Sequence, residues 1–220
     1  MSATEVKVTD SRTQQHKALT QSLHDLIQAS QITLVDEQLL AQAQELVSRA
    51  EAILAADTYG GPYSTGGMSN GPIPIEFDYQ DLSLCMPYSP ISGRHNAIAP
   101  KIHMFTVDKS VAGTAFYEAS HAGPPGCVHG GIIAGLFDEL LAMANIVNGF
   151  GAFTGSLEIQ YHRPTPLGVE LTLEAECESI RGRKVISVGR IKCGNTVTAI
   201  AKGLFIKPKS GELDIPGEDD

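Results

Sequence analysis

A loop rich in glycine and proline runs directly into an apolar stretch between Gly123 and Glu139, in the sequence GPPGCVHGGIIAGLFDE. Apolar residues recur there at helical spacing, and the pair Gly130 and Gly131 can open the first turn. At about 100° per residue they form one broad apolar face, made of Ile132, Ile133, Leu136, Phe137, Leu140, Met143 and Ala144. The segment therefore predicts a helix that must bury one face, and the rest of the fold has to cover it.

Asp138 lies on the opposite side of this helix and looks like a buried acid. Its own face lacks the Lys, Glu and Gln of a solvent-facing helix and consists of Gly131, Ala134, Gly135, Ala142 and Asn145. One interpretation is that a second helix packs there and a hydrogen bond satisfies Asp138. The other is that the small face makes room for a substrate. Unpaired helix N–H groups near Gly130 and Gly131 would then hold its carbonyl oxygen, while Asp138 attacks or activates water.

The run PPGCVHGGIIAGLFD resembles the signature of hotdog-fold acyl-CoA thioesterases, specifically those of the phenylacetic acid degradation type. Its HGG tripeptide begins at His129, and an acid follows nine residues later at Asp138. The later run from Thr154 to Gly168, TGSLEIQYHRPTPLG, resembles the family's strand with a Y-x-R-P ending. The resemblance covers about Pro74 to Lys207. It implies an enzyme that hydrolyses acyl-CoA thioesters to the free acid and CoA, with no cofactor.

The resemblance also implies roles for individual residues. The backbone N–H of Gly130 would face the thioester oxygen, with that of Gly131 as the second choice. Asp138 would act as nucleophile or general base, and Thr154 would orient the attacking water or the carboxylate. His129 would position the carbonyl or brace the loop.

One position departs from the family pattern. Many members place an Asn six residues before the HGG histidine, where this chain has Gly123. In the family, this Asn belongs to the network that positions the attacking water. The resemblance therefore does not extend that network to this chain.

A second function class stays open, namely a non-catalytic hotdog protein that binds acyl-CoA as a sensor or scaffold. Asp138 favours the enzyme, because carboxylate-driven attack on a thioester requires an ionisable group and binding alone does not.

Helix geometry separates the two halves of the expected site. Gly130 and Asp138 are eight positions apart, which is ~12 Å along a helix at ~1.5 Å per residue. Reacting groups must approach to ~3 to 3.5 Å, so one chain cannot complete the site. We therefore expect a two-fold dimer, or a dimer of dimers, in which Gly130 of one subunit meets Asp138 of another.

Strand-like segments around the helix predict an α+β hotdog fold, with an antiparallel β-sheet wrapped around a central α-helix. The expected strands are Lys101–Val107, Ala112–Ala119, Ala152–His162, Val169–Ser179, Lys184–Cys193 and Asn195–Ile206. Alternation along Ala152–His162 places Phe153, Leu157, Ile159 and Tyr161 on one face and Thr154 on the other.

Four segments are expected along the chain: an N-terminal helical extension over 1–57, a Gly/Pro/Ser-rich linker over 58–74, the hotdog thioesterase domain over 75–208 and an acidic tail over 209–220. Within the extension, helical spacing predicts helices over Gln14–Ala29 and Asp36–Ala56, the second with Asp36 as N-cap. Extra packing is the preferred interpretation of this pair. Capping the hotdog, enlarging a dimer interface and forming a lid over an acyl tunnel stay open.

Composition narrows the partners and the compartment. A net charge of -9 argues against nucleic acid. With 42% hydrophobic and 19% charged residues, 220 residues can build a substantial core, and no apolar run approaches a membrane span. No positively charged start precedes an apolar stretch, so we expect a cytoplasmic protein without a membrane partner. The 4 cysteines have no C-x-x-C spacing, which predicts free thiols and no metal site.

Coenzyme A is polyanionic, so an acidic protein needs a local basic patch to hold this substrate. Arg163 is the first candidate because it belongs to the Y-x-R-P run, and Lys184 is another. Further candidates near strand ends and turns are Arg181, Arg183 and Lys202.

Overall fold

The computed structural model describes residues 3–58 and 78–209. The expected linker over 58–74 and the expected acidic tail over 209–220 fall almost entirely outside these residues.

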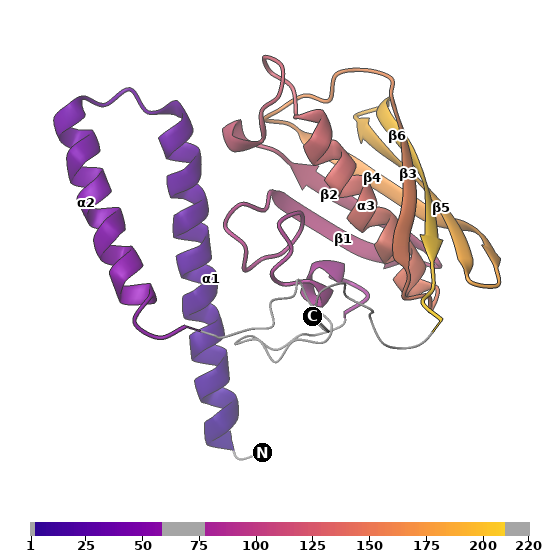
Figure 1. Cartoon of the computed structure of the whole chain (residues 1–220), viewed down its shortest axis with the longest axis horizontal. Coiled ribbons are helices and arrows are strands. Elements are labelled where there is room, and N and C mark those ends of the chain that lie inside the picture. Colours follow the sequence, from indigo (N-terminus) through magenta and orange to yellow (C-terminus); the bar gives the residue numbers. More distant parts are fainter. Residues whose placement is uncertain (1–2, 59–77, 210–220) are drawn as a thin grey trace, which may run out of the picture.

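An antiparallel sheet around one long helix forms the body of the molecule, which confirms the fold class expected from the sequence (Figure 1). The 6-stranded sheet has the order β1-β2-β4-β5-β6-β3, so β1 and β3 are its two edges. The strands are β1 (Lys101–Val107), β2 (Ser110–Phe116), β3 (Phe153–Tyr161), β4 (Glu170–Arg181), β5 (Lys184–Cys193) and β6 (Thr196–Ile206). The long helix is α3 (Gly130–Val147), and two short 3-10 helices are η1 (Leu82–Cys85) and η2 (Ala119–His121).

The core lies between α3 and the sheet. The apolar face of α3 is at most 3% exposed at Ile133, Leu136, Phe137, Leu140 and Met143. Each such side chain contributes about 1.5–3 kcal/mol on burial. Gly189 and Gly203 let the helix approach, because a Cβ at these positions would come within 2.9 Å and 3.1 Å of Leu141.

By length and composition alone, α3 is also apolar enough to cross a membrane, contrary to the expectation that no apolar run approaches a membrane span. Half of that stretch is buried inside the fold, as in the core helix of many folded domains, so the feature is weak evidence for a span.

Tight turns join the hairpins of the sheet. Val107 pairs with Ser110, so Asp108 and Lys109 alone make the first turn, with Asp108 at a φ of 54°. This short turn explains why β2 begins at Ser110 and not at the expected Ala112. Gly182 and Gly194 adopt positive φ in the two later turns, as turn chemistry predicts.

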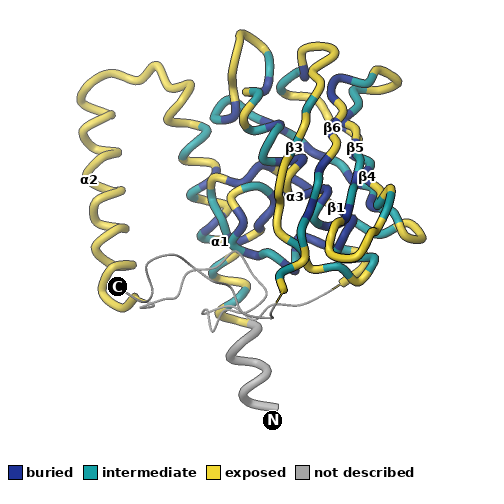
Figure 2. The backbone as a smooth tube through the Cα atoms, turned by 45° about the vertical axis from the view of Figure 1, so that its right-hand side comes forward, coloured by how far each residue is buried: buried dark blue, intermediate teal, exposed yellow. Residues whose placement is uncertain are grey.

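Two helices precede the sheet domain. The first, α1 (Ala3–Ile32), is longer than the helix expected over Gln14–Ala29. The second is α2 (Glu37–Leu54). Asp36 is its N-cap, as expected, and the carboxylate of Asp36 accepts a hydrogen bond of 3.0 Å from the N–H of Leu39. Figure 1 shows α1 beside the body and α2 on the far side of α1. Figure 2 shows that α2 is exposed along its length, and it has no buried residue in the single chain.

Candidate active site

His129 caps the start of α3 with its side chain. Its Nδ1 accepts a hydrogen bond of 3.0 Å from the N–H of Gly131. Since Nδ1 is the acceptor, the neutral ring carries its proton on Nε2. The N–H of Gly131, the second-choice donor for a thioester oxygen, is therefore occupied by the cap.

The N–H of Gly130 has no acceptor among the residues that the structure describes. The carbonyl of the same peptide unit, that of His129, accepts from the N–H groups of Ile132 at 3.0 Å and Ile133 at 3.2 Å. Hydrogen bonds at the carbonyl polarise a peptide and strengthen its N–H as a donor. Gly130 therefore presents the stronger candidate for holding an oxyanion.

The loop before the helix explains the departure at Gly123. A Cβ there would lie 2.7 Å from the Cα of His129. The N–H of Gly123 donates to the carbonyl of Cys127 at 2.9 Å, and the N–H of His129 donates to the carbonyl of His121 at 2.9 Å. The backbone at 123 is thus packed against His129, and an Asn side chain would not fit this loop.

Asp138 is exposed in the single chain, so its interpretation as a buried acid was wrong. The buried acid of α3 is its neighbour Glu139, which is 8% exposed and accepts hydrogen bonds from the hydroxyls of Ser89 and Ser92. Burial raises the pKa of Glu139, against the opposing effect of the two serine hydroxyls. The segment over 82–100 has no periodic pattern, so its position over Glu139 had no sequence signal.

Thr154 contacts Asp138 directly. Its Oγ1 donates to Oδ1 of Asp138 at 2.6 Å. One carboxylate oxygen is thereby fixed, while Oδ2 has no hydrogen-bond donor among the described residues.

The position of Thr154 on β3 corrects the face assigned to it. The pairing of β3 with β6 shifts between Thr154 and Ser156, so Gly155 is an extra residue in a β-bulge. Thr154 then pairs with Phe205, a fully buried residue. The bulge breaks the period of two and turns Thr154 to the side of α3, together with Leu157 and away from Phe153.

Tyr161 is a site residue for which the sequence had suggested no role, although it stands in the Y-x-R-P run. Its hydroxyl donates to the carbonyl oxygen of Gly130 at 2.9 Å. The edge strand β3 therefore contacts α3 at both ends, through Tyr161 to Gly130 and through Thr154 to Asp138.

The small face of α3 is partly filled within the chain. A Cβ at Gly135 would lie 2.7 Å from Cδ1 of Ile91. Asn145, expected on the same face, is 1% exposed and accepts from the hydroxyl of Ser187 at 2.6 Å. At these two positions, Ile91 of a loop and Ser187 of β5 occupy the space that was expected to hold a second helix or a substrate.

A crystal structure of a thioesterase superfamily protein superposes on the chain with a TM-score of 0.72 and 30% sequence identity, over 87% of this chain and 94% of that one. The chain belongs to the thioesterase superfamily. The family model matches residues 125–200, which include the helix α3 and its loop. The superfamily's hotdog architecture agrees with the sheet wrapped around α3.

Curated relatives of this thioesterase superfamily chain include the acyl-coenzyme A thioesterase THEM4 of Xenopus laevis, with 34% identity over 87 residues, or 39% of each protein. The human acyl-coenzyme A thioesterase THEM5 is 30% identical over 87 residues, which are 39% of this chain and 35% of that protein. The matched part thus spans well under half the length of these relatives.

The two first candidates for CoA binding lie apart in the thioesterase superfamily fold. Both Arg163 and Lys184 are exposed. The N–H of Arg163 donates to the carbonyl of Thr198 near the start of β6, whereas Lys184 pairs with Ile206 at its end. Within one chain they lie at opposite ends of β6 and form no common patch.

Proposed function

We propose that the chain hydrolyses acyl-CoA thioesters to the free acid and CoA, as an enzyme of the phenylacetic acid degradation type. The observation that carries the proposal is the pair of groups on α3: an N–H at Gly130 without an acceptor in the described part of the chain, and an exposed carboxylate at Asp138 held by Thr154. The printed names of the curated relatives, acyl-coenzyme A thioesterases, support the same chemistry.

Gly130 would stabilise the oxyanion that forms when the thioester carbonyl is attacked. Its N–H lies at the positive end of α3, and its peptide is polarised by the two hydrogen bonds to the carbonyl of His129. A donor of this kind is worth about 2.7–4 kcal/mol in the transition state.

Asp138 would supply the attack through Oδ2, the oxygen that Thr154 leaves free. Either this oxygen adds to the thioester carbon, or it takes a proton from a water that adds. In both routes the C–S bond breaks and the CoA sulfur leaves as thiolate, and water provides the second oxygen of the free acid.

The two groups would meet across a two-fold axis. Along α3, eight positions separate them by ~12 Å. β3 is an edge strand with contacts to Gly130 at one end and to Asp138 at the other. Antiparallel pairing of β3 with its copy would set the Tyr161 end of one strand against the Thr154 end of the other. Each Gly130 would then face Asp138 of the partner subunit, in a dimer or in each half of a dimer of dimers.

The direct test is release of free CoA thiol from a panel of acyl-CoA substrates by the wild type and by Asp138→Asn. We expect the substitution to lower kcat by about a thousandfold or more, because the acid is the attacking group or the base. Glu176→Gln, which removes an exposed carboxylate from β4, serves as the matched control and should keep the wild-type rate. Full activity in Asp138→Asn would contradict the assignment, and acyl-CoA binding without turnover by the wild type would favour a sensor or scaffold.

A further inference from the structure

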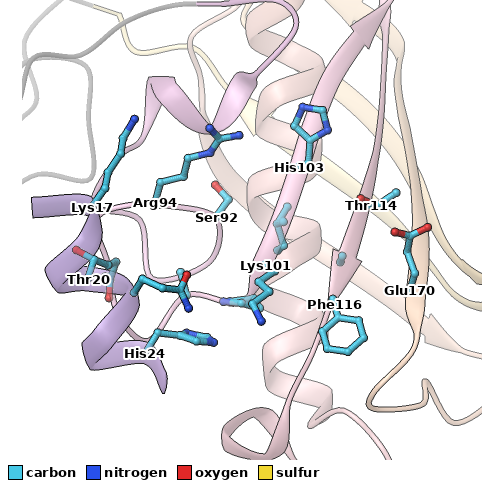
Figure 3. Close-up of a pocket in the computed structure, with 17 residues that line it drawn as sticks. Lys17, Thr20, His24, Ser92, Arg94, Lys101, His103, Thr114, Phe116 and Glu170 are labelled. Carbon is cyan, nitrogen blue, oxygen red and sulfur yellow. The ribbon is translucent and has the colours of Figure 1, made fainter. Parts of the chain in front are cut away.

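A cavity of about 450 Å³ lies between α1 and the β1 edge of the sheet. Its walls come from α1, from the segment over 92–100, and from β1, β2 and the start of β4. Figure 3 shows Lys17, Thr20 and His24 on α1 across the opening from Lys101 and Phe116 on the strands. None of the groups assigned to thioester hydrolysis lines this cavity, since they contact the opposite edge strand, β3.

Cationic side chains dominate the charged lining, although the protein as a whole carries a net charge of -9. Lys17, Arg94 and Lys101 line the cavity, and Glu170 is the carboxylate among the lining residues. Two of these three cationic side chains form ion pairs with acids that do not line the cavity. Arg94 pairs with Asp81, and Lys101 lies 3.2 Å from a carboxylate oxygen of Glu118.

One lysine of the lining leaves positive charge available to a ligand. Lys17 has no ion-pair partner among the described residues. The oxygen of Glu118 that contacts Lys101 also contacts Nε2 of His24, at 2.9 Å, so the contact between His24 and Glu118 does not depend on Lys101. An anion in the cavity could therefore contact Lys17 and Lys101 without breaking the contact between His24 and Glu118.

The lining also has an apolar part, the ring of Phe116 on the same face of the sheet as Lys101. The Nζ of Lys101 lies 5.9 Å from the ring centroid of Phe116, so the charge and the apolar surface are adjacent. A volume of about 450 Å³ lies in the ordinary range for small-molecule sites. A ligand that matches this lining has an anionic head and a compact apolar or aromatic body.

We propose that the cavity between α1 and β1 binds a small organic anion, whose carboxylate or phosphate group contacts Lys17 and Lys101 and whose body packs on Phe116. The bound anion joins α1 to the sheet, because Lys17 belongs to the helix and Lys101 to the strand. A ligand that requires both walls stabilises the docked helix by mass action.

The test uses the full chain and three probes: octanoate, adenosine 5′-monophosphate and the neutral octanamide. Isothermal titration calorimetry and the thermal unfolding midpoint are measured at low and moderate salt. We expect saturable binding of at least one anion, weakened by salt, with an upward shift of the midpoint. Binding of octanoate alone identifies a carboxylate ligand, and binding of the nucleotide alone identifies a phosphate ligand.

The paired variant Lys17→Gln/Lys101→Gln should weaken anion binding at least tenfold. Lys109→Gln changes one exposed lysine of the β1–β2 turn, outside the cavity, and should leave the affinity unchanged. Circular dichroism checks that both variants remain folded. Titrations are repeated with a saturating non-hydrolysable acyl-CoA analogue, which occupies the thioester site.

Three results would overturn the proposal. They are the absence of saturable binding by either anion, equal binding of octanoate and octanamide, and loss of binding when the acyl-CoA analogue is present. Unchanged affinity in the paired lysine variant would count equally against it. Failure of thioester hydrolysis would leave these binding results untouched, because the cavity and the hydrolytic groups use different residues.

Discussion

At Gly130, a pair of substitutions can separate the backbone donor from the helix that carries it. Proline at the first helical position lacks the N–H but is tolerated there, and His129 already has the extended conformation that precedes proline, with φ -63° and ψ 133°. Alanine keeps the N–H, and its Cβ would lie 3.7 Å from the hydroxyl of Tyr161, an ordinary contact.

We expect Gly130→Pro to lower kcat for acyl-CoA hydrolysis by about 10²–10³-fold, because one oxyanion donor is lost. Gly130→Ala should stay within a few-fold of the wild type. Steady-state thiol release measures both rates. Equal activity of the proline and alanine variants would mean that this N–H does not hold the oxyanion.

Tyr161 supports the same helix start through its hydroxyl. Tyr161→Phe removes the hydrogen bond to the carbonyl of Gly130 but keeps the ring, so we expect kcat to fall about two- to tenfold, in line with one hydrogen bond of about 0.5–1.5 kcal/mol. KM and the unfolding midpoint should change little, because the phenol is exposed and the donor remains in place. A change confined to KM or to the midpoint would argue against a positioning role.

For individual residues, the sequence predicted which reactive groups belong to α3, but it did not predict their burial or their contacts. Helical spacing placed Asp138 and the glycine pair correctly on one helix. It did not distinguish the exposed Asp138 from the buried Glu139, because burial of Glu139 depends on Ser89 and Ser92 from an aperiodic segment. The contact of Tyr161 with Gly130 joins residues 31 positions apart and left no local signal.

Among the elements, strands were predictable where alternation and turn residues agreed. β1 and β5 match the expected strands at both ends, since Asp108, Gly182 and Gly194 mark the turns beside them. The bulge at Gly155 was missed, and with it the true face of Thr154, because one extra residue leaves the composition of the strand unchanged.

The helix α1 is docked through histidines, which makes its attachment sensitive to acid. Nδ1 of His16 lies 3.0 Å from Nδ1 of His95, and burial, with smaller contributions from His16, Lys17 and Arg94, lowers the pKa of His95 to about 4. Burial also lowers the pKa values of His16 and His121. Between about pH 6.5 and pH 4 these histidines therefore bind more protons in the unfolded state than in the folded state, so their contribution to stability falls as the pH falls through this window.

We expect His95→Asn to reduce this loss, so that the drop in unfolding midpoint from pH 7 to pH 4.5 becomes smaller by several degrees than in the wild type. His162→Asn, at an exposed histidine after β3, is the control and should reproduce the wild-type slope. Thermal melts followed by circular dichroism provide the midpoints. An identical slope for His95→Asn and the wild type would rule out His95 as a source of the acid sensitivity.

For the whole molecule, the composite site can be tested by mixing two inactive variants. In a mixed dimer of Asp138→Asn and Gly130→Pro, one site pairs the intact glycine with the intact aspartate, and the other carries both substitutions. Random exchange of subunits makes half of the dimers mixed, and each mixed dimer has one intact site out of two. A two-fold arrangement therefore predicts that the mixture regains about a quarter of the wild-type activity. Refolding the variants together and separately, followed by thiol-release assays, gives the comparison. A mixture no more active than its components would contradict a site shared between subunits.

The edge strand β3 carries the contacts to both halves of the site, and none of the described residues forms a strand on its outer side. On the proposed assembly, a newly folded chain already has every group that the reaction needs and still leaves thioesters intact until it meets a second copy. Specific activity would then decline on dilution, and the abundance of the protein would set the threshold at which acyl-CoA begins to be consumed.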